Sequence, residues 1–154
     1  MKRLTLISAC FALTLLIARD AGSQTKITRN VSNDAIENIL KSLELKYTKV
    51  EPKDKDSATM YFEFMRGDLP CRLKNYGSDL WLECILEKKL GMEEINRWNA
   101  DAKFSRLVMI EEKTKTILSL ESQLDCLGGV TDAIIKQYIV RFDEEAKKFA
   151  KFVK

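Results

Sequence analysis

The feature that most constrains the fold is a hairpin pattern around Gly77-Ser78. Glycine at the first central position suits a two-residue type II′ turn, which joins two antiparallel strands. Pairing Tyr76 with Asp79 across this turn places one set of apolar residues on the same face: Cys71, Leu73, Leu80, Leu82, Cys84 and Leu86. A slip of one residue would move the whole set to the other face. We therefore expect an antiparallel sheet with one buried face.

The same register brings two cysteines together. If Tyr76 and Asp79 form the hydrogen-bonded closing pair, alternation makes Cys71 and Cys84 a non-hydrogen-bonded pair with Cα atoms about 4.5 Å apart. That separation lies in the lower range of disulfide geometry. Two interpretations stay open: a disulfide, which an oxidising compartment permits, or two buried thiols that face each other. Cys126 is expected to be a small buried packing residue.

Periodicity elsewhere predicts the remaining elements. Spacing of i, i+3, i+4 and i+7 indicates helices, and strict alternation indicates strands. The expected elements, in chain order, are a helix capped by Ser32, an edge strand over 46–51, a strand over 59–66, the hairpin strands 71–76 and 79–86, a helix over 91–102, a hairpin of 104–111 and 116–124, and a long helix capped by Thr131. The order α-β-β-β-α-β-β-α, with or without the edge strand, predicts an α+β fold with helices on one face of an antiparallel sheet.

The N-terminus has the layout of a secretory signal peptide. Lys2 and Arg3 precede an uncharged, almost wholly apolar run over Leu4–Ala18, and small residues follow near Ser23. A helix of that length rises only ~22 Å, short of the ~30 Å hydrocarbon core, so a permanent membrane span is not expected. Cleavage after Ser23 would leave a mature protein that begins at Gln24 in the periplasm or outside the cell.

A rival pattern lies inside the apolar run. The segment Ile7-Ser8-Ala9-Cys10 resembles a bacterial lipoprotein box, which would place a lipid on Cys10. The apolar run continues past Cys10, whereas a lipidated cysteine should close it. The domain organisation that we expect is therefore a signal peptide over 1–23, a polar leader over 24–30 and one domain over 31–154.

Composition narrows the classes of function. Loss of residues 1–23 removes three basic residues and one acidic residue, which lowers the formal net charge from +3 to +1. Basic and acidic residues then interleave, so no footprint for nucleic acid is expected. The chain has no histidine, which excludes Ser-His-Asp and Cys-His mechanisms and the commonest ligand of catalytic zinc. We assign no catalytic, cofactor-binding or metal-binding residue, and expect the carboxylate runs Glu111-Glu112 and Asp143-Glu144-Glu145 to be solvated.

Three short motifs carry a family resemblance. They are Ile95-Asn96-Arg97-Trp98-Asn99, Phe104-Ser105-Arg106, and Leu127-Gly128-Gly129-Val130-Thr131 before an amphipathic helix. With these motifs the chain resembles the YbjN family of bacterial proteins over roughly residues 31–153. The resemblance implies a fold like that of type III secretion chaperones, a tendency to dimerise, and a sensory or regulatory role without an established reaction. The signal sequence departs from cytoplasmic members and argues against a cytoplasmic chaperone role.

The motif residues also have structural interpretations. On a short helix, Trp98 is expected to anchor the core and Asn99 to supply a hydrogen-bonding group at the helix end. The second hairpin places Arg106 opposite Glu121, which predicts a cross-strand ion pair. Gly128-Gly129 lacks the pattern of a phosphate loop and is interpreted as a turn into the last helix.

The strand alternation finally predicts an interaction surface. Residues that alternate with the core set should lie on the opposite face of the sheet: Tyr61, Met65, Tyr76, Trp81, Ile85, Val108, Ile110 and Ile117. We expect this face to be covered by a second copy of the chain, by a partner protein, or by the C-terminal helix. The function that follows is an exported, non-catalytic binding or regulatory module. The alternatives are a periplasmic chaperone-like protein or a small periplasmic enzyme that uses carboxylates or a thiol.

Overall fold

The hairpin around Gly77-Ser78 forms in the predicted register. Strands β3 (Leu69–Asn75) and β4 (Asp79–Glu87) pair antiparallel, and Cys71 lies opposite Cys84. The N–H of Tyr76 donates to the carbonyl of Asp79 at 2.9 Å. Gly77 has a φ of 82°, in the left-handed region that favours glycine. The turn residues therefore set the register, and the register sets which side chains are buried.

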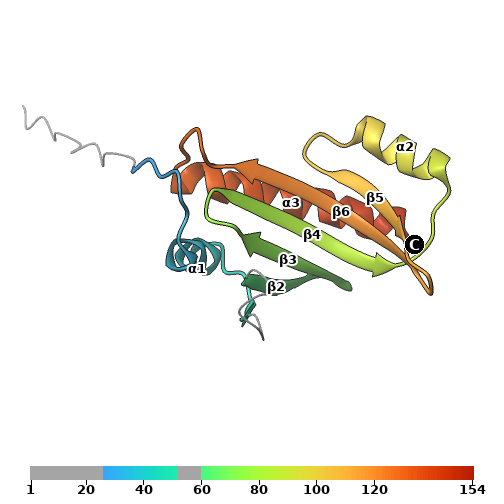
Figure 1. Ribbon diagram of the computed structural model, residues 1–154, viewed down its shortest axis with the longest axis horizontal. Helices are drawn as coiled ribbons and strands as arrows, with labels where there is room; N and C mark the ends of the chain where they lie inside the picture. Colours follow the sequence, from blue (N-terminus) through green and yellow to red (C-terminus); the bar gives the residue numbers. More distant parts are fainter. Residues whose placement is uncertain (1–25, 52–59) are drawn as a thin grey trace, which may run out of the picture.

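The protein is described here by a computed structural model, which covers residues 26–51 and 60–154. The predicted signal peptide over 1–23, which includes Cys10, lies outside the described residues. Six strands form one antiparallel sheet in the order β1-β2-β3-β4-β6-β5 (Figure 1). The other four strands are β1 (Thr48–Val50), β2 (Tyr61–Arg66), β5 (Arg106–Glu111) and β6 (Thr116–Asp125).

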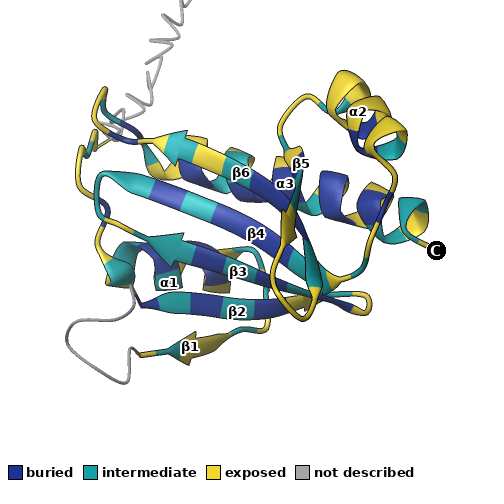
Figure 2. Cartoon of the chain, turned by 45° about the vertical axis from the view of Figure 1, so that its right-hand side comes forward, coloured by how far each residue is buried: buried dark blue, intermediate teal, exposed yellow. Residues whose placement is uncertain are grey.

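Two helices cover one face of this sheet. Helices α1 (Asn33–Ser42) and α3 (Asp132–Phe152) lie behind it in Figure 2, and we call the face that they cover the inner face. The predicted caps are present: Ser32 accepts a hydrogen bond from the N–H of Ala35 at 3.2 Å, and Thr131 accepts one from Ile134 at 3.3 Å. The predicted α+β class is confirmed.

Helix α2 (Met92–Asp101) has a different position from the one predicted. It lies beside the outer edge of β5, not over the face of the sheet (Figure 2). Trp98 is 8% exposed, and its ring packs against Phe149 and Phe152 of α3 with centroids 5.5 and 5.3 Å away. A helix with only two buried side chains, Ile95 and Trp98, can seal an edge but cannot cover a sheet face.

The core lies between the inner face of the sheet and helices α1 and α3. Its largest fully buried side chains are Phe62, Phe142, Phe149, Ile36, Ile39, Leu40, Leu73, Leu80, Leu82, Leu118, Leu120 and Ile135. Strands β2, β3, β4 and β6 contribute to this set, and the two members from β4 and the two from β6 are alternate residues, as a half-buried sheet requires. The opposite side of the sheet, which we call the outer face, is not covered by any helix of the described residues (Figure 2).

Candidate interaction surface

The predicted interaction residues lie on the outer face. The register pairs Ile85 with Ser119 and Ser119 with Val108, and it pairs Ile110 with Ile117. Met65 and Ile110 are 54% and 46% exposed, whereas the side chains between them are half-buried. We call Met65, Ile85, Val108, Ile110 and Ile117 the apolar cluster. These side chains come from β2, β4, β5 and β6, so the antiparallel register brings together residues that are far apart in the chain.

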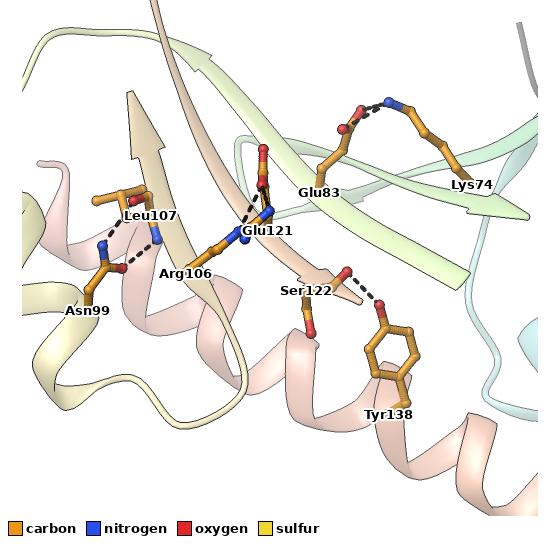
Figure 3. A network of polar contacts seen from close by, with 8 residues as sticks. All are labelled: Lys74, Glu83, Asn99, Arg106, Leu107, Glu121, Ser122 and Tyr138. Carbon is orange, nitrogen blue, oxygen red and sulfur yellow. Dashed lines mark hydrogen bonds and ion pairs between the residues drawn. The ribbon is translucent and has the colours of Figure 1, made fainter. Parts of the chain in front are cut away.

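A row of ion pairs interrupts the expected apolar surface. It consists of Glu63 with Arg72 at 3.1 Å, Glu83 with Lys74 at 2.9 Å, and Glu121 with Arg106 at 3.1 Å. Figure 3 shows the second and third of these pairs. The apolar residues of the outer face are therefore divided by a charged row. The same alternation that turned the apolar residues outward also turned these charged residues outward.

The cations of this row also shield aromatic rings. The guanidinium of Arg72 lies 5.2 Å from the ring centre of Tyr61, and that of Arg106 lies 5.6 Å from the ring centre of Trp81. Both aromatic side chains are consequently half-buried. Tyr76, at the end of β3, is 52% exposed and lies apart from the apolar cluster. The outer face thus has an aromatic side and an aliphatic side, with charges between them.

Two carboxylates in the row are buried although no element covers them. Glu83 is 5% exposed and Glu121 is 9% exposed, and the two residues are direct neighbours across β4 and β6. Ser119 beside them is 3% exposed, and its hydroxyl has no hydrogen-bond partner among the described residues. Like charges directly opposite each other repel, and the ion pairs with Lys74 and Arg106 offset this repulsion. The centre of the outer face is therefore a charged but already paired surface.

The C-terminal helix does not cover the outer face. Helix α3 packs on the inner face, where Ile135, Ile139 and Phe142 are buried. One of the three predicted ways to cover the outer face is thereby excluded. The reason is that the apolar stripe of α3 matches the inner residues of β2, β4 and β6, and a single helix cannot bury both faces.

Asn99 has a role that the sequence did not indicate. Its side-chain amide donates to the carbonyl of Leu107 at 3.0 Å and accepts from the N–H of Leu107 at 2.6 Å (Figure 3). The predicted role was a hydrogen bond at the end of its own helix. Asn99 instead satisfies the two backbone groups that Leu107 directs toward the free edge of β5. Its amide acts as one peptide unit of an additional strand, and α2 thereby covers this edge at Leu107.

Arg106 and the two glycines occupy the places predicted for them. Arg106 lies opposite Glu121 and donates to it from both Nε and Nη2, at 3.2 and 3.1 Å. Gly129 has a φ of 95°, and a Cβ there would come within 2.6 Å of Ile27 Cγ2. Gly128 precedes it in the turn before α3. These motif residues therefore have structural functions in this chain.

The thiols and carboxylates are poorly suited to catalysis. Cys71 and Cys84 are joined by a disulfide with Cα atoms 4.2 Å apart. Burial, together with the nearby charges of Asp79 and Asp125, raises the pKa of the Cys126 thiol and so disfavours the reactive thiolate. No three acidic or cysteine side chains of the described residues gather as a metal site.

Carboxylates of both acidic runs also form ion pairs or hydrogen bonds. Glu111 pairs with Lys89 at 2.9 Å, and Asp143 pairs with Arg66. Glu145 is buried, not solvated as predicted, because it faces Ser105, whose hydroxyl donates to it at 2.6 Å.

Tyr138 is the polar residue that sequence reasoning missed. It belongs to the apolar stripe of α3, yet its hydroxyl reaches between β4 and β6, where it donates to the carbonyl of Ser122 at 2.7 Å (Figure 3). The same hydroxyl accepts from the N–H of Leu82 at 3.2 Å. Burial raises the pKa of Tyr138 well above its ordinary value. No sequence signal separates a tyrosine of this kind from one that only packs.

No family model and no curated protein matches this chain. Among solved structures, YbjN from E. coli, solved as a proposed transcription regulator, is similar with a TM-score of 0.56 at 9% identity, covering 77% of this chain and 90% of that chain. A chain of the ExoT–SpcS complex from Pseudomonas aeruginosa has a TM-score of 0.49 at 18% identity, covering 74% of this chain and 92% of that one. The likeness to YbjN shows a shared fold. No helix of the described residues is both long and apolar enough to span a bilayer.

Proposed function

We propose that the protein is an exported, non-catalytic binding or regulatory module that works through its outer sheet face. The observation that carries this proposal is that α1 and α3 cover only the inner face, while Met65 and Ile110 of the apolar cluster stay exposed. Soluble domains seldom leave a large contiguous apolar area in water. The shared fold with YbjN and the three sequence motifs support remote membership of the YbjN family and a regulatory role.

The occupant of the outer face is a second copy of the chain. Each carboxylate of the ion-pair row has a basic partner on the same face, so the row brings no net charge to the surface. Two such surfaces can meet without the cost of juxtaposed like charges, and the apolar clusters of both copies can then be buried together. A twofold axis through the face would make the contact isologous, as in most homodimers.

Sedimentation equilibrium tests this assignment. The wild-type protein should dimerise at micromolar concentration, and Ile85→Glu should shift it to monomer because it would bury an unpaired charge. Val140→Glu is the matched control, since Val140 is 43% exposed on α3 and far from the outer face. A wild type that stays monomeric at high micromolar concentration would remove the dimer. Variants that unfold, with the circular dichroism signal lost, would show that this face is core.

Export is the second part of the proposal. The basic start, the apolar run and the small residues near Ser23 support a mature protein that begins at Gln24 in the periplasm. Mass spectrometry of the protein from its native host should find Gln24 at the N-terminus. An intact Met1 on cytoplasmic protein would contradict export, and a diacylglycerol on Cys10 would establish the lipoprotein alternative.

A further inference from the structure

Strand β6 is longer than its neighbour β5 and continues beyond the point where β5 begins. Strand β5 begins at Arg106, opposite Glu121, whereas β6 continues to Asp125. In the same register, residue 104 would lie opposite Gln123, but the chain bends away before β5 begins. Figure 1 shows the far end of β6 with β4 on only one side of it. The last four residues of β6 are therefore an open edge of the sheet.

The backbone of Gln123 points into this opening. The N–H of Tyr76 donates to the carbonyl of Asp79, so Asp79 and every second residue of β4 after it direct their backbone groups toward β3. Leu82 belongs to the other half of the strand residues, so its backbone groups point toward β6, where Leu82 pairs with Ser122. Gln123 follows Ser122, so its N–H and C=O point away from β4. No backbone hydrogen bond from the turns and loops of the described residues reaches them.

A cavity of about 480 Å³ lies at this open edge. Trp81 lines it on the outer side of the sheet, and Ile134 and Tyr138 of α3 line it on the inner side. Phe104 and Ile134 are each 42% exposed there. An additional strand-like segment in this space would direct alternate side chains toward Trp81 and toward Ile134, because successive residues of a strand point to opposite faces.

The charge of the cavity lining indicates which kind of peptide segment would bind beside β6. Three basic side chains, Lys103, Arg106 and Arg141, line the cavity. The one acidic side chain in the lining, Glu121, is already paired with Arg106. The guanidinium of Arg141 lies 4.4 Å from the ring centre of Phe104, at the end of the opening. The surplus of positive charge favours a segment with acidic side chains and disfavours the basic leader of the chain itself, which contains Lys26 and Arg29.

Other parts of the sheet edge are protected. The amide of Asn99 closes the edge of β5 at Leu107, and the opposite edge of the sheet is β1, which has only three residues. Proteins commonly protect sheet edges by such covers and by short edge strands. Among the described residues, the end of β6 has neither form of protection, and a cavity lined by both apolar and basic side chains lies beside it.

We propose that the edge of β6 at Gln123 binds an extended acidic peptide by strand addition. The N–H and C=O of Gln123 would bond to the peptide backbone, Trp81 and Ile134 would contact alternate apolar side chains, and Lys103 and Arg141 would attract its carboxylates. This site lies at the edge of β6 and shares Trp81 with the outer face that the dimer is proposed to use. A failure of either proposal can be recognised separately, because peptide binding is measured by calorimetry and dimerisation by sedimentation.

The first test uses short synthetic peptides that repeat two valines and two glutamates, so that each face of the bound strand carries both residue types, titrated into the wild-type protein by isothermal calorimetry. The glutamate peptide should bind, a valine–lysine peptide should bind about tenfold more weakly or not at all, and an N-methylated glutamate peptide should lose about tenfold in affinity. Equal binding of the N-methylated peptide would show attraction by charge alone and would overturn strand addition. Absence of binding by the glutamate peptide would also overturn it.

Two sets of variants locate the site. Gln123→Pro removes the edge N–H and should weaken binding about tenfold, whereas Gln123→Ala keeps the backbone and should change it less than about twofold. Arg141→Glu should weaken binding, and Lys113→Glu, in the exposed β5–β6 turn, is the control with the same change of charge. In the wild type, bound peptide should slow amide exchange at Gln123 and leave Leu124 unchanged. Unchanged exchange at Gln123, or equal binding by all variants, would contradict the site.

Discussion

At the scale of single residues, Tyr138 links α3 to the centre of the sheet. Its hydroxyl fills a position between β4 and β6 where it both donates and accepts a hydrogen bond. Loss of the hydroxyl would leave the Ser122 carbonyl and the Leu82 N–H with fewer partners in a buried place. Tyr138→Phe should therefore lower the free energy of unfolding by about 1–3 kcal/mol at neutral pH, measured by urea unfolding.

The same residue predicts a dependence on pH. The pKa of Tyr138 is raised in the folded state because burial disfavours the phenolate, whereas an unfolded tyrosine ionises at about pH 10. Above that pH the unfolded state loses a proton that the folded state keeps, so the stability of the wild type should fall. Tyr138→Phe should reduce this alkaline loss, and Cys126 contributes equally to both proteins. An identical alkaline loss in the two proteins would contradict the assignment.

At the scale of elements, Asn99 joins α2 to β5. Asn99→Ala removes both hydrogen bonds to Leu107 and should lower the free energy of unfolding by about 2 kcal/mol. The amide of Leu107 should then exchange faster, because the edge of β5 becomes accessible to water. Asn96→Ala is the control, since Asn96 is exposed on the same helix. Unchanged exchange at Leu107 would show that α2 does not close this edge.

The β3–β4 hairpin carries the disulfide. Cys71 and Cys84 are 13 residues apart in sequence, and closing a loop of this size stabilises a protein by about 3 kcal/mol in the chain-entropy model. Cys71→Ala with Cys84→Ala should therefore lower the free energy of unfolding by an amount of that order. Peptide mapping without reduction should show these cysteines linked and Cys126 free. Three alkylatable thiols in the unfolded, unreduced protein would contradict the bond.

The elements show which features a sequence can predict. The register around Gly77-Ser78 follows from local turn chemistry and alternation, so it was correct to the residue. The position of α2 was not predicted, because periodicity shows which side of a helix is buried but not what it packs against. The prediction of the outer-face residues was only partly correct, since Glu83 and Glu121 lie on this face too. Their burial depends on partners brought from other strands.

At the scale of the whole molecule, the sheet has one covered face, one closed edge and two open surfaces. The inner face carries the core, and Asn99 closes the edge of β5. The outer face and the end of β6 are the surfaces that remain for other chains. They differ in chemistry: the outer face has paired charges and an apolar cluster, whereas the end of β6 has free backbone groups and surplus positive charge. The fold therefore supports two distinct modes of protein binding.

The central claim is that two copies meet through their outer faces, and a distance between spin labels tests it most directly. In a Cys126→Ala background, one nitroxide is placed at Glu87→Cys on the outer face, and a separate sample carries it at Glu144→Cys on α3. Packed sheets lie about 10 Å apart, so the account predicts an intermolecular distance below about 35 Å for the first sample and a clearly longer one for the second. A shorter distance between the α3 labels, or no intermolecular coupling in either sample, would contradict the claim.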